Sequence, residues 1–319
     1  MPGIGRGSAA DMVSPARILV TGADGFVGRH LQATLEHAFP RALLLVDPFD
    51  LRDATAVEAA VAAGRPDACI HLAAIATLAA ARLDEARCWD VNLHGTLRLA
   101  NAILRHVPAC QMLFVSSADA YGGGTGAPIN EQVPLAPRNL YAATKAAADL
   151  ALGALAGEGL RIVRVRPFNH TGPGQSADLV IPAFARQIAR IAARRQQPVL
   201  EVGQLETWRD FLDVRDVCTA YASCLRRSEA LAPGEVLNIG SGKPRRIGDV
   251  LRELLNLAGI EAEVHTSAPR PRPEDVEHSC ADVSRARALL DWAPALPWER
   301  TLADVLADWH ARVAAGADA

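Results

Sequence analysis

Short, uninterrupted apolar runs alternate with longer segments of helical periodicity through the first half of the 319-residue chain. The apolar runs are expected to be strands, at 17–21, 42–46, 68–72 and 111–116. A further strand is expected at 161–166, where Arg alternates with Ile and Val. The segments between them are expected to be helices, at 26–38, 55–63, 85–106 and 141–156. Continuous apolar strands separated by helices are typical of parallel sheets that are buried on both faces. The pattern therefore predicts an α/β fold with a doubly wound parallel sheet.

Charge and cysteine content exclude several classes of protein. The net charge is −3, and no basic face is available for nucleic acid as the main partner. The most apolar stretch, 68–81, contains His71 and is shorter than the roughly 20 residues that cross a bilayer. The six cysteines form no Cys-x-x-Cys pair, which is typical of buried thiols in a reducing compartment rather than of disulfides or a metal site. We expect a cytoplasmic protein that binds no nucleic acid, no membrane and no metal.

A glycine-rich turn follows the first expected strand. Gly22, Gly25 and Gly28 stand in the sequence Thr-Gly-Ala-Asp-Gly-Phe-Val-Gly at 21–28, directly before the first expected helix. Glycine at these positions permits a tight turn and a close approach of the backbone to a pyrophosphate, which then meets the N-terminus of the helix. The turn predicts a Rossmann fold that binds a dinucleotide.

An acidic residue after the second expected strand bears on the choice of dinucleotide. Asp47 follows Gly28 by 19 residues, close to the spacing of the acid that binds the ribose 2′-hydroxyl and repels a 2′-phosphate. NAD(P)H is thus the expected cofactor, with NAD slightly favoured over NADP. The alternative is that Asp47 only caps a turn before Pro48. Because only 21 residues separate Gly28 from Asp50, one strand of this half is expected to be reduced or missing.

The regular alternation of strands and helices ends after Phe168. Further helices are expected near 179–194, 215–227, 247–258, 283–290 and 300–314. Further strands are expected near 198–202, 235–239 and 261–266, with a Pro- and Arg-rich loop at 268–273. The chain is expected to begin with a flexible extension at 1–15, in which Met12 is an alternative start. A Rossmann domain at 16–168 and a smaller C-terminal α/β substrate domain at 169–319 are expected to follow. Segments of the second domain near 210–240 are expected to return to the first.

A tyrosine and a lysine lie one helical turn apart at the start of the helix at 141–156. Tyr141 and Lys145 would share one face of that helix, and an ammonium group beside a phenol lowers the pKa of the phenol. Ser117 ends the preceding strand, and in a parallel sheet the strand C-termini face the ligand crevice. Ser117 would then bind a carbonyl oxygen that Tyr141 protonates. The alternatives are a surface Tyr–Lys pair and a serine that only caps a strand end.

Several motifs together resemble the extended short-chain dehydrogenase/reductase family, over about residues 17–315. They are the glycines at 22–28, Asp-Leu-Arg-Asp at 50–53, His-Leu-Ala-Ala at 71–74, Asp-Val-Asn-x-x-Gly-Thr at 90–96, Ser-Ser-Ala-Asp-Ala-Tyr-Gly at 116–122, and Tyr141-x-x-x-Lys145. The resemblance implies that Ser117, Tyr141 and Lys145 are catalytic. It places Asp50 and Leu51 beside the adenine. The full set of expected cofactor residues is Gly22, Gly25, Phe26, Val27, Gly28, Asp47, Asp50, Leu51, Leu72, Ala73, Ala74, Asn92, Ser116, Tyr141 and Lys145.

The second half is similar to members that act on GDP-mannose-type sugars. The similarity lies in Arg-Pro-Phe-Asn-His-Thr-Gly-Pro-Gly-Gln at 166–175, the segment 202–216, and Arg-Pro-Glu-Asp-Val at 272–276. It is greatest to the reductases of GDP-6-deoxy-4-keto-mannose, which form the rhamnose or talose sugar. The implied partner is a GDP-linked 6-deoxy-4-keto sugar, with the implied substrate residues Thr77, Asn169, Val180, Arg209, Arg272 and Asp275. Alternatively, Arg209 only forms an ion pair with Asp213.

Asp119 leaves other activities open. It occupies the position at which sugar 4,6-dehydratases carry the glutamate that removes the C5 proton, and we expect it to act as an auxiliary acid/base or positioning group. Asp275 also replaces the glutamate that is usual in the family. The enzymatic alternative is a 4,6-dehydratase or a 4-epimerase, either of which would recycle NAD. The alternative of another class is a non-catalytic binding protein that responds to a nucleotide. The resemblance further implies a homodimer formed through the helices at 85–106 and 141–156.

Overall fold

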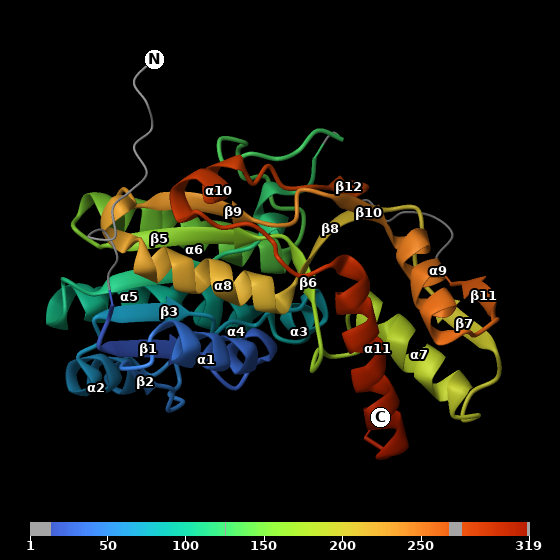
Figure 1. Ribbon diagram of the computed structural model, residues 1–319. Coiled ribbons are helices and arrows are strands. Elements are labelled where there is room, and N and C mark those ends of the chain that lie inside the picture. The colour runs from blue at the N-terminus through green and yellow to red at the C-terminus, as the bar shows by residue number, and fades with distance from the viewer. Residues whose placement is uncertain (1–13, 125, 268–275, 318–319) are drawn as a thin grey trace.

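The computed structural model describes residues 14–124, 126–267 and 276–317, and a six-stranded parallel sheet forms its centre (Figure 1). The strands follow the order β2-β1-β3-β4-β5-β9. Their bounds are β1 Arg17–Thr21, β2 Leu43–Leu45, β3 Ala68–His71, β4 Gln111–Val115, β5 Ile162–Pro167 and β9 Glu235–Ile239. The predicted doubly wound parallel sheet is confirmed. The strand order reverses at β1 and β3, the kind of position at which open α/β sheets bind ligands.

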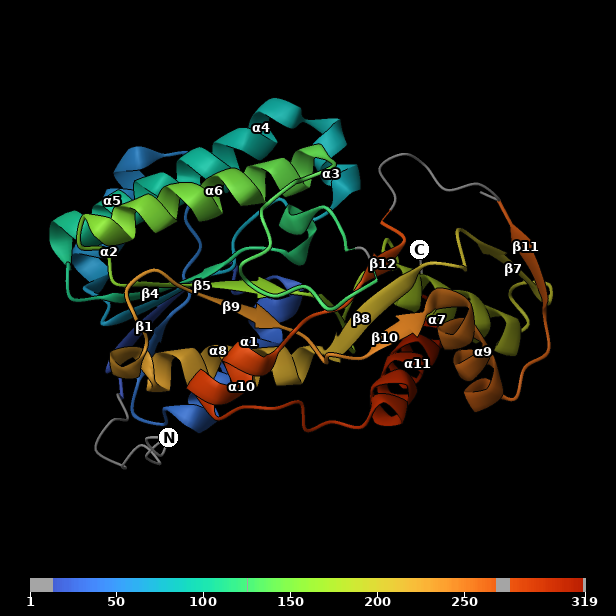
Figure 2. The ribbon, with the colours of Figure 1, turned by 90° about the horizontal axis from the view of Figure 1, so that it is seen from above.

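Helices cover both faces of this sheet (Figure 2). One face carries α2 (Ala54–Gly64), α5 (Thr96–His106) and α6 (Leu140–Gly157), whose apolar side chains share a core with the sheet. The other face carries α1 (Phe26–Ala38), α8 (Val214–Arg226) and α10 (Ser284–Leu290). Because both faces are covered, the strands are mainly apolar on both sides of the sheet, and the arginines of β5 are the main exception.

Two details of the first half differ from the expected pattern. The helix expected at 85–106 comprises α4 (Glu85–Trp89), a π-helical segment η2 (Asp90–Gly95) and α5. An extra short helix, α3 (Leu78–Leu83), precedes it. At the sheet edge β2 has only three residues, and the chain passes from it through a short loop directly to α2, as expected for a reduced strand in this half.

The second half contributes a separate apolar core. There α7 (Val180–Ala192), α9 (Ile247–Ala258) and α11 (Trp298–Ala314) pack together, beside the parallel pair β7 (Val199–Val202) and β11 (Glu263–Thr266). A small sheet joins this core to the first half, with the order β10-β8-β12 and β6 also paired to β8. Its strands are β6 Asn169–Thr171, β8 Trp208–Asp213, β10 Pro244–Arg246 and β12 His278–Ser279.

These four strands lack a sequence signal. They have between two and six residues and are rich in charged and polar side chains, so neither an apolar run nor a clear alternation marks them. The remaining elements are two 3₁₀ turns, η3 (Ala118–Tyr121) and η4 (Ser228–Ala230). None of the helices within the described ranges has the length and apolar character of a membrane span. The extension expected at 1–15 lies almost entirely outside the described residues, as does the loop expected at 268–273.

Candidate active site

Four loops meet at the C-terminal edge of the central sheet. They follow β1, β3, β4 and β5, and parallel strands bring these ends to one side of the molecule. The loops carry the glycine turn, Leu72–Ala74, Ser116 with Ser117, and Asn169 with His170. Most of the sequence-predicted site residues are therefore gathered at one edge, on separate elements of a rigid sheet.

The glycine turn leaves no room for side chains. Gly22 has a φ of +71°, and a Cβ there would stand 2.8 Å from the backbone nitrogen of Ala73. A Cβ on Gly28 would stand 2.3 Å from the carbonyl oxygen of Gly22. The turn closes with a bond from the Gly25 N–H to the Gly22 carbonyl oxygen (3.1 Å). Helix α1 then begins at Phe26 without a side-chain cap, so the first backbone N–H groups remain available to an anion. The turn fits the pyrophosphate of a dinucleotide.

A buried histidine connects this turn to its neighbours. His71 bonds Thr21 Oγ1 through Nδ1 (2.6 Å) and Thr96 Oγ1 through Nε2 (2.9 Å). Burial and the charge of Lys145 lower the pKa of His71 to about 3, so the ring is neutral. The Thr96 hydroxyl already donates to the Asn92 carbonyl oxygen, so Nε2 carries the ring proton and Thr21 donates to Nδ1. Thr21 also accepts the N–H of Ala73, which fixes the loop after β3.

Asn92 holds the same loop from the other side. Its Oδ1 accepts the N–H of Ile75 (2.8 Å), and its Nδ2 donates to the Ile75 carbonyl oxygen and to Thr144 Oγ1. The side chain is 1% exposed and lies in the π-helical segment η2. Asn92 thus ties the loop that follows β3 to helix α6, which carries Tyr141 and Lys145.

Ser117 and Tyr141 lie together at the mouth of this edge. Ser117 lies two residues beyond the end of β4 and caps η3 by accepting the N–H of Asp119. Tyr141 stands in the first turn of α6, a helix that Asn139 caps. Burial raises the pKa of the half-buried Tyr141, and a hydrogen bond from Ser117 opposes that rise. The expectation that Lys145 lowers the pKa of Tyr141 is wrong for this structure, because the lysine is directed elsewhere.

Lys145 is buried behind Tyr141. Its Nζ donates to the carbonyl oxygen of Val115 (2.6 Å) and lies 5.0 Å from the centre of the Phe114 ring. Burial lowers the pKa of this amine to about 8, and Asp149 one turn further along α6 opposes the shift. The lysine is therefore a desolvated cation whose charge is lost in mildly alkaline solution.

Asp149 belongs to a buried charge network that the sequence did not reveal. Arg166 binds it with Nε and Nη2 (2.9 and 3.0 Å), and Arg164 adds Nη1 (2.8 Å). Arg166 also donates to the Tyr121 hydroxyl, which donates to Asn238 on β9. The available signals were the arginines that interrupt an otherwise apolar strand and an acid four residues after Lys145. The network fixes α6 on β5.

Asp119 faces a cation across the site. It lies on η3, and although part of the residue is open to solvent, burial of its carboxyl group raises its pKa. The positive charge of Arg209, on β8, opposes this rise, and Asp119 in turn raises the pKa of Tyr141. The ion pair considered between Arg209 and Asp213 is absent, since the carboxylate of Asp213 binds Arg215 and Thr301 instead.

The other expected substrate residues are scattered around this edge. Asn169 begins β6, Val180 begins α7, and Thr77 caps α3 by accepting the N–H of Ala80. His170 stacks on Phe26, with an angle of 4° between the rings. Its Nδ1 donates to the Phe168 carbonyl oxygen, and burial lowers its pKa, so Nε2 is an unprotonated acceptor. Arg272 and Asp275 lie outside the described residues.

The acidic residues after β2 lie in two different surroundings. Asp50 binds Arg52 through both carboxylate oxygens, and this hydrogen bonding lowers the pKa of Asp50 to about 2. Leu51 is buried and packs closely on Gly95: a Cβ added to Gly95 would stand 2.8 Å from the Cβ of Leu51. Asp47 is exposed just beyond β2.

Comparison with known proteins agrees with this arrangement. Residues 18–240 match the model of the NAD dependent epimerase/dehydratase family. GDP-6-deoxy-D-mannose reductase of Pseudomonas aeruginosa is 39% identical over 93% of this chain and 98% of its own. UDP-glucose 4-epimerase of Azospirillum brasilense is 28% identical over 90% and 92%.

Solved structures give the same result. RMD from Pseudomonas aeruginosa complexed with NADPH superposes with a TM-score of 0.84 at 35% identity, covering 93% of this chain and 99% of that one. UDP-glucose 4-epimerase of Thermus thermophilus in complex with NAD gives 0.81 at 26% identity, over 92% and 98%. With its glycine turn, its Ser-Tyr-Lys group and these relatives, the chain belongs to the NAD dependent epimerase/dehydratase family.

Proposed function

We propose that this enzyme reduces the C4 keto group of a GDP-4-keto-6-deoxy-hexose to the GDP-6-deoxy-hexose of rhamnose or talose type, with NAD(P)H as the reductant. The observation that carries the proposal is the placement of Ser117, Tyr141 and Lys145 beside the glycine turn at one edge of the sheet. The 39% identity to a GDP-6-deoxy-D-mannose reductase supports the choice of substrate.

Each residue of the site has its own role in the proposed reduction. The bound dinucleotide would supply a hydride. Tyr141 donates its phenolic proton to the C4 oxygen, and its raised pKa keeps that proton in place until it is needed. Ser117 donates a hydrogen bond that steadies the same oxygen. Lys145, which is charged at neutral pH, would bind the ribose of the nicotinamide with its ammonium group. Arg209 would bind the diphosphate, for which a guanidinium group is well suited.

Asp119 favours reduction over dehydration. In a dehydratase this position must remove a proton from C5, whereas Asp119 has a shorter side chain than glutamate and faces Arg209. Without an acid of full length at this place, we assign Asp119 a positioning role toward Tyr141 and the sugar. We further propose the segment after 168 as the substrate-binding part of the chain.

The assay uses enzymatically generated GDP-4-keto-6-deoxy-mannose and follows the absorbance of NADH or NADPH. Stoichiometric oxidation is expected, and NMR of the product assigns the configuration at C4. A lack of oxidation would reject this substrate. Turnover of GDP-mannose or a UDP- or dTDP-sugar without added reductant would instead establish the dehydratase or the epimerase reaction.

The pH dependence of kcat tests the role of Lys145. Because burial lowers the pKa of this amine to about 8, it is charged at neutral pH, and kcat should fall as the pH rises through about 8. Lys145→Arg keeps the charge, so its lower kcat should lack this fall. A profile that stays flat in the wild type, or a fall that persists in the arginine variant, would contradict the assignment.

We propose Asp47 as the residue that discriminates between the two cofactors. It is exposed beyond β2 and makes no ion pair or hydrogen bond with any residue of the described ranges, so its charge is free to repel a 2′-phosphate. We expect kcat/KM to be higher with NADH, and Asp47→Ser to shift the ratio toward NADPH by about tenfold. Asp53→Ser, which removes a carboxylate of similar exposure and keeps a hydroxyl that caps α2, is the control. An unchanged ratio in the Asp47 variant would remove this role.

We also propose a homodimer in the cytoplasm, formed through α4, α5 and α6. Leu83 and Leu150, at the end of α3 and on α6, are 88% and 60% exposed, as expected for side chains that a second copy covers. Light scattering of the purified protein should give twice the chain mass, and Leu150→Glu should reduce it to that of the monomer. Monomeric wild-type protein would exclude this assembly.

A further inference from the structure

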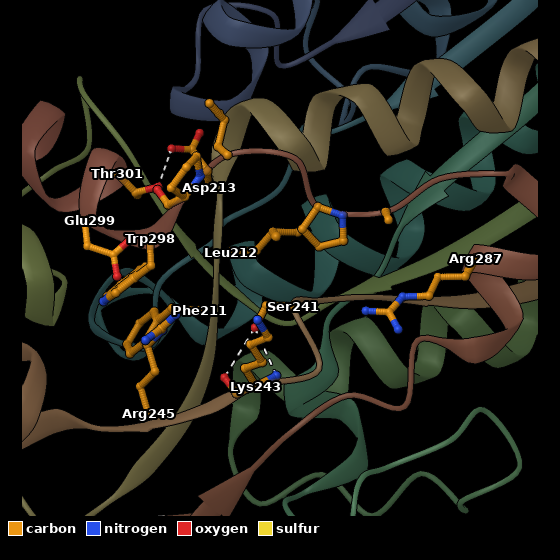
Figure 3. A pocket seen from close by; sticks show the side chains of 14 residues that line it. Phe211, Leu212, Asp213, Ser241, Lys243, Arg245, Arg287, Trp298, Glu299 and Thr301 are labelled. Carbon is orange, nitrogen blue, oxygen red and sulfur yellow. Dashed lines mark hydrogen bonds between the residues drawn. The ribbon is translucent and has the colours of Figure 1, made fainter.

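A cavity of about 300 Å³ lies where the linker between α10 and α11 meets β8 and the loop between β9 and β10 (Figure 3). Leu212 and Pro294 supply apolar walls. The cationic side chains of Lys243, Arg245 and Arg287 line it from three different elements. Figure 3 shows Arg287 reaching across from α10 toward the side of the cavity formed by the β9–β10 loop.

These cations have no anionic partners. Within the ranges that the structure describes, none of the three side chains forms an ion pair or a hydrogen bond. The guanidinium of Arg245 stacks over Trp298 at 4.3 Å from the ring centre, and its Nε is buried without a hydrogen-bond partner. Burial lowers the pKa of Arg245, and the negative charges of Glu253, Glu299 and Asp210 offset only part of this shift.

Acidic groups do not balance this charge. Asp213 lines the cavity, but Arg215 binds both of its oxygens and Thr301 donates to one of them. Glu299 is the remaining carboxylate of the lining, and it makes no ion pair with the described residues. Among the lining side chains, three cations therefore face Glu299 and the already paired Asp213, so the lining itself has a net positive charge. Asp210 and Glu253, which are not part of the lining, also act on Arg245.

The cavity wall is rigid on the side of the cations. The buried carboxylate of Asp210 accepts hydrogen bonds from the Ser241 N–H and hydroxyl, the Gly242 N–H and the Ala281 N–H. These bonds pin the loop that precedes Lys243. A binding group held in place in this way loses little freedom when a ligand arrives.

The cavity is separate from the proposed catalytic residues. Its lining includes none of the residues assigned to the cofactor or to catalysis. Helix α6, which carries Tyr141 and Lys145, covers one face of the central sheet, whereas α8, α10 and the linker to α11 lie on the opposite face (Figure 2).

We propose that this cavity is a second binding site, for a small phosphorylated anion. Phosphate oxygens would accept from Arg245, Arg287 and Lys243, since guanidinium and ammonium groups form strong charge-assisted bonds with phosphate. Helix α11 begins beside them at Trp298, after Pro297, without a side-chain cap. Its first N–H groups add partial positive charge on the same side.

Isothermal titration with inorganic pyrophosphate tests the proposal on the full-length enzyme. Excess NADPH and GDP are present throughout, so that neither the glycine turn nor the proposed substrate site is available. One further binding event is expected. Lys243→Gln and Arg287→Gln should each weaken it about fivefold, the size expected for one partly exposed charge-assisted bond. A hexose 1-phosphate in place of pyrophosphate distinguishes phosphate esters from the inorganic anion.

Two further variants separate charge in the cavity from general effects. Glu299→Gln removes the opposing carboxylate and should tighten binding about two- to threefold, a gain that damage to the fold would not produce. Arg300→Gln is the matched control, because Arg300 lies on the same turn of α11 but pairs with Asp304 outside the cavity lining. Absence of binding, or equal affinity in all four variants, would overturn the proposal.

Discussion

Replacing Tyr141 with Phe is expected to lower kcat by a factor of about 10² to 10⁴, the usual contribution of a positioned general acid. In the proposed reaction the phenol protonates the C4 oxygen, and in the structure Ser117 bonds to this phenol. The thermal midpoint of unfolding should change little, because only a half-buried hydroxyl is lost. Single-turnover rates of cofactor oxidation measure the effect without interference from product release.

The chain supplies its own control for this substitution. The hydroxyl of Tyr221 is fully buried in the core between α8 and the sheet, and it has no hydrogen-bond partner among the described residues. Tyr221→Phe removes the same atom from an apolar place, so activity should persist and stability should stay equal or rise. If Tyr141→Phe retained full activity, or if both variants lost it equally, Tyr141 would not be the acid.

Replacing Gly28 with Ala is expected to weaken cofactor binding about 100-fold, because opening the turn moves its N–H groups away from the pyrophosphate. The new Cβ would stand 2.3 Å from the Gly22 carbonyl oxygen and 2.5 Å from that of Ala23. Both neighbours are backbone atoms, so the turn itself must open. Overpacking should also lower the free energy of unfolding by about 1–3 kcal/mol.

Gly157→Ala is the comparison for this second substitution. A Cβ on Gly157 meets nothing within 4 Å, and the residue lies in the last turn of α6. Alanine there should stabilise the helix by up to about 1 kcal/mol and leave the affinity for cofactor unchanged. Fluorescence titration with NADH or NADPH and thermal unfolding of both variants measure the two effects. Equal affinities would mean that the turn does not hold the pyrophosphate.

The central sheet could be predicted because its signals are local. Strands β1 to β4 are apolar runs, β5 alternates Arg with Ile and Val, and the helices α1, α2 and α6 show their own periodicity. The small sheet of β6, β8, β10 and β12 could not, since its short polar strands are held by long-range pairing to β8. Pairing between distant segments leaves little trace in the composition of either one.

The site shows the same division. Residue types and spacing predicted Ser117, Tyr141 and Lys145, but not where the lysine points. The direction of Lys145 depends on Val115, and its charge on Asp149 with two arginines of β5. The protonated nitrogen of His71 likewise depends on a hydroxyl 25 residues away. Such properties arise from contacts between elements, and no single motif contains them.

The position of β9 in the central sheet has a consequence for how the protein is made. A ribosome releases β5 long before β9, and domains generally fold as units while the chain emerges. Until residues 235–239 are available, one edge of β5 remains unpaired, and until residues 214–226 are available α1 lacks the apolar cover of α8. The nascent chain thus exposes a strand edge that invites aggregation for about 70 residues of synthesis, between Pro167 and Ile239. Shortened forms of the chain that end before β9 should therefore be insoluble when expressed in cells, or soluble only when chaperones are also present.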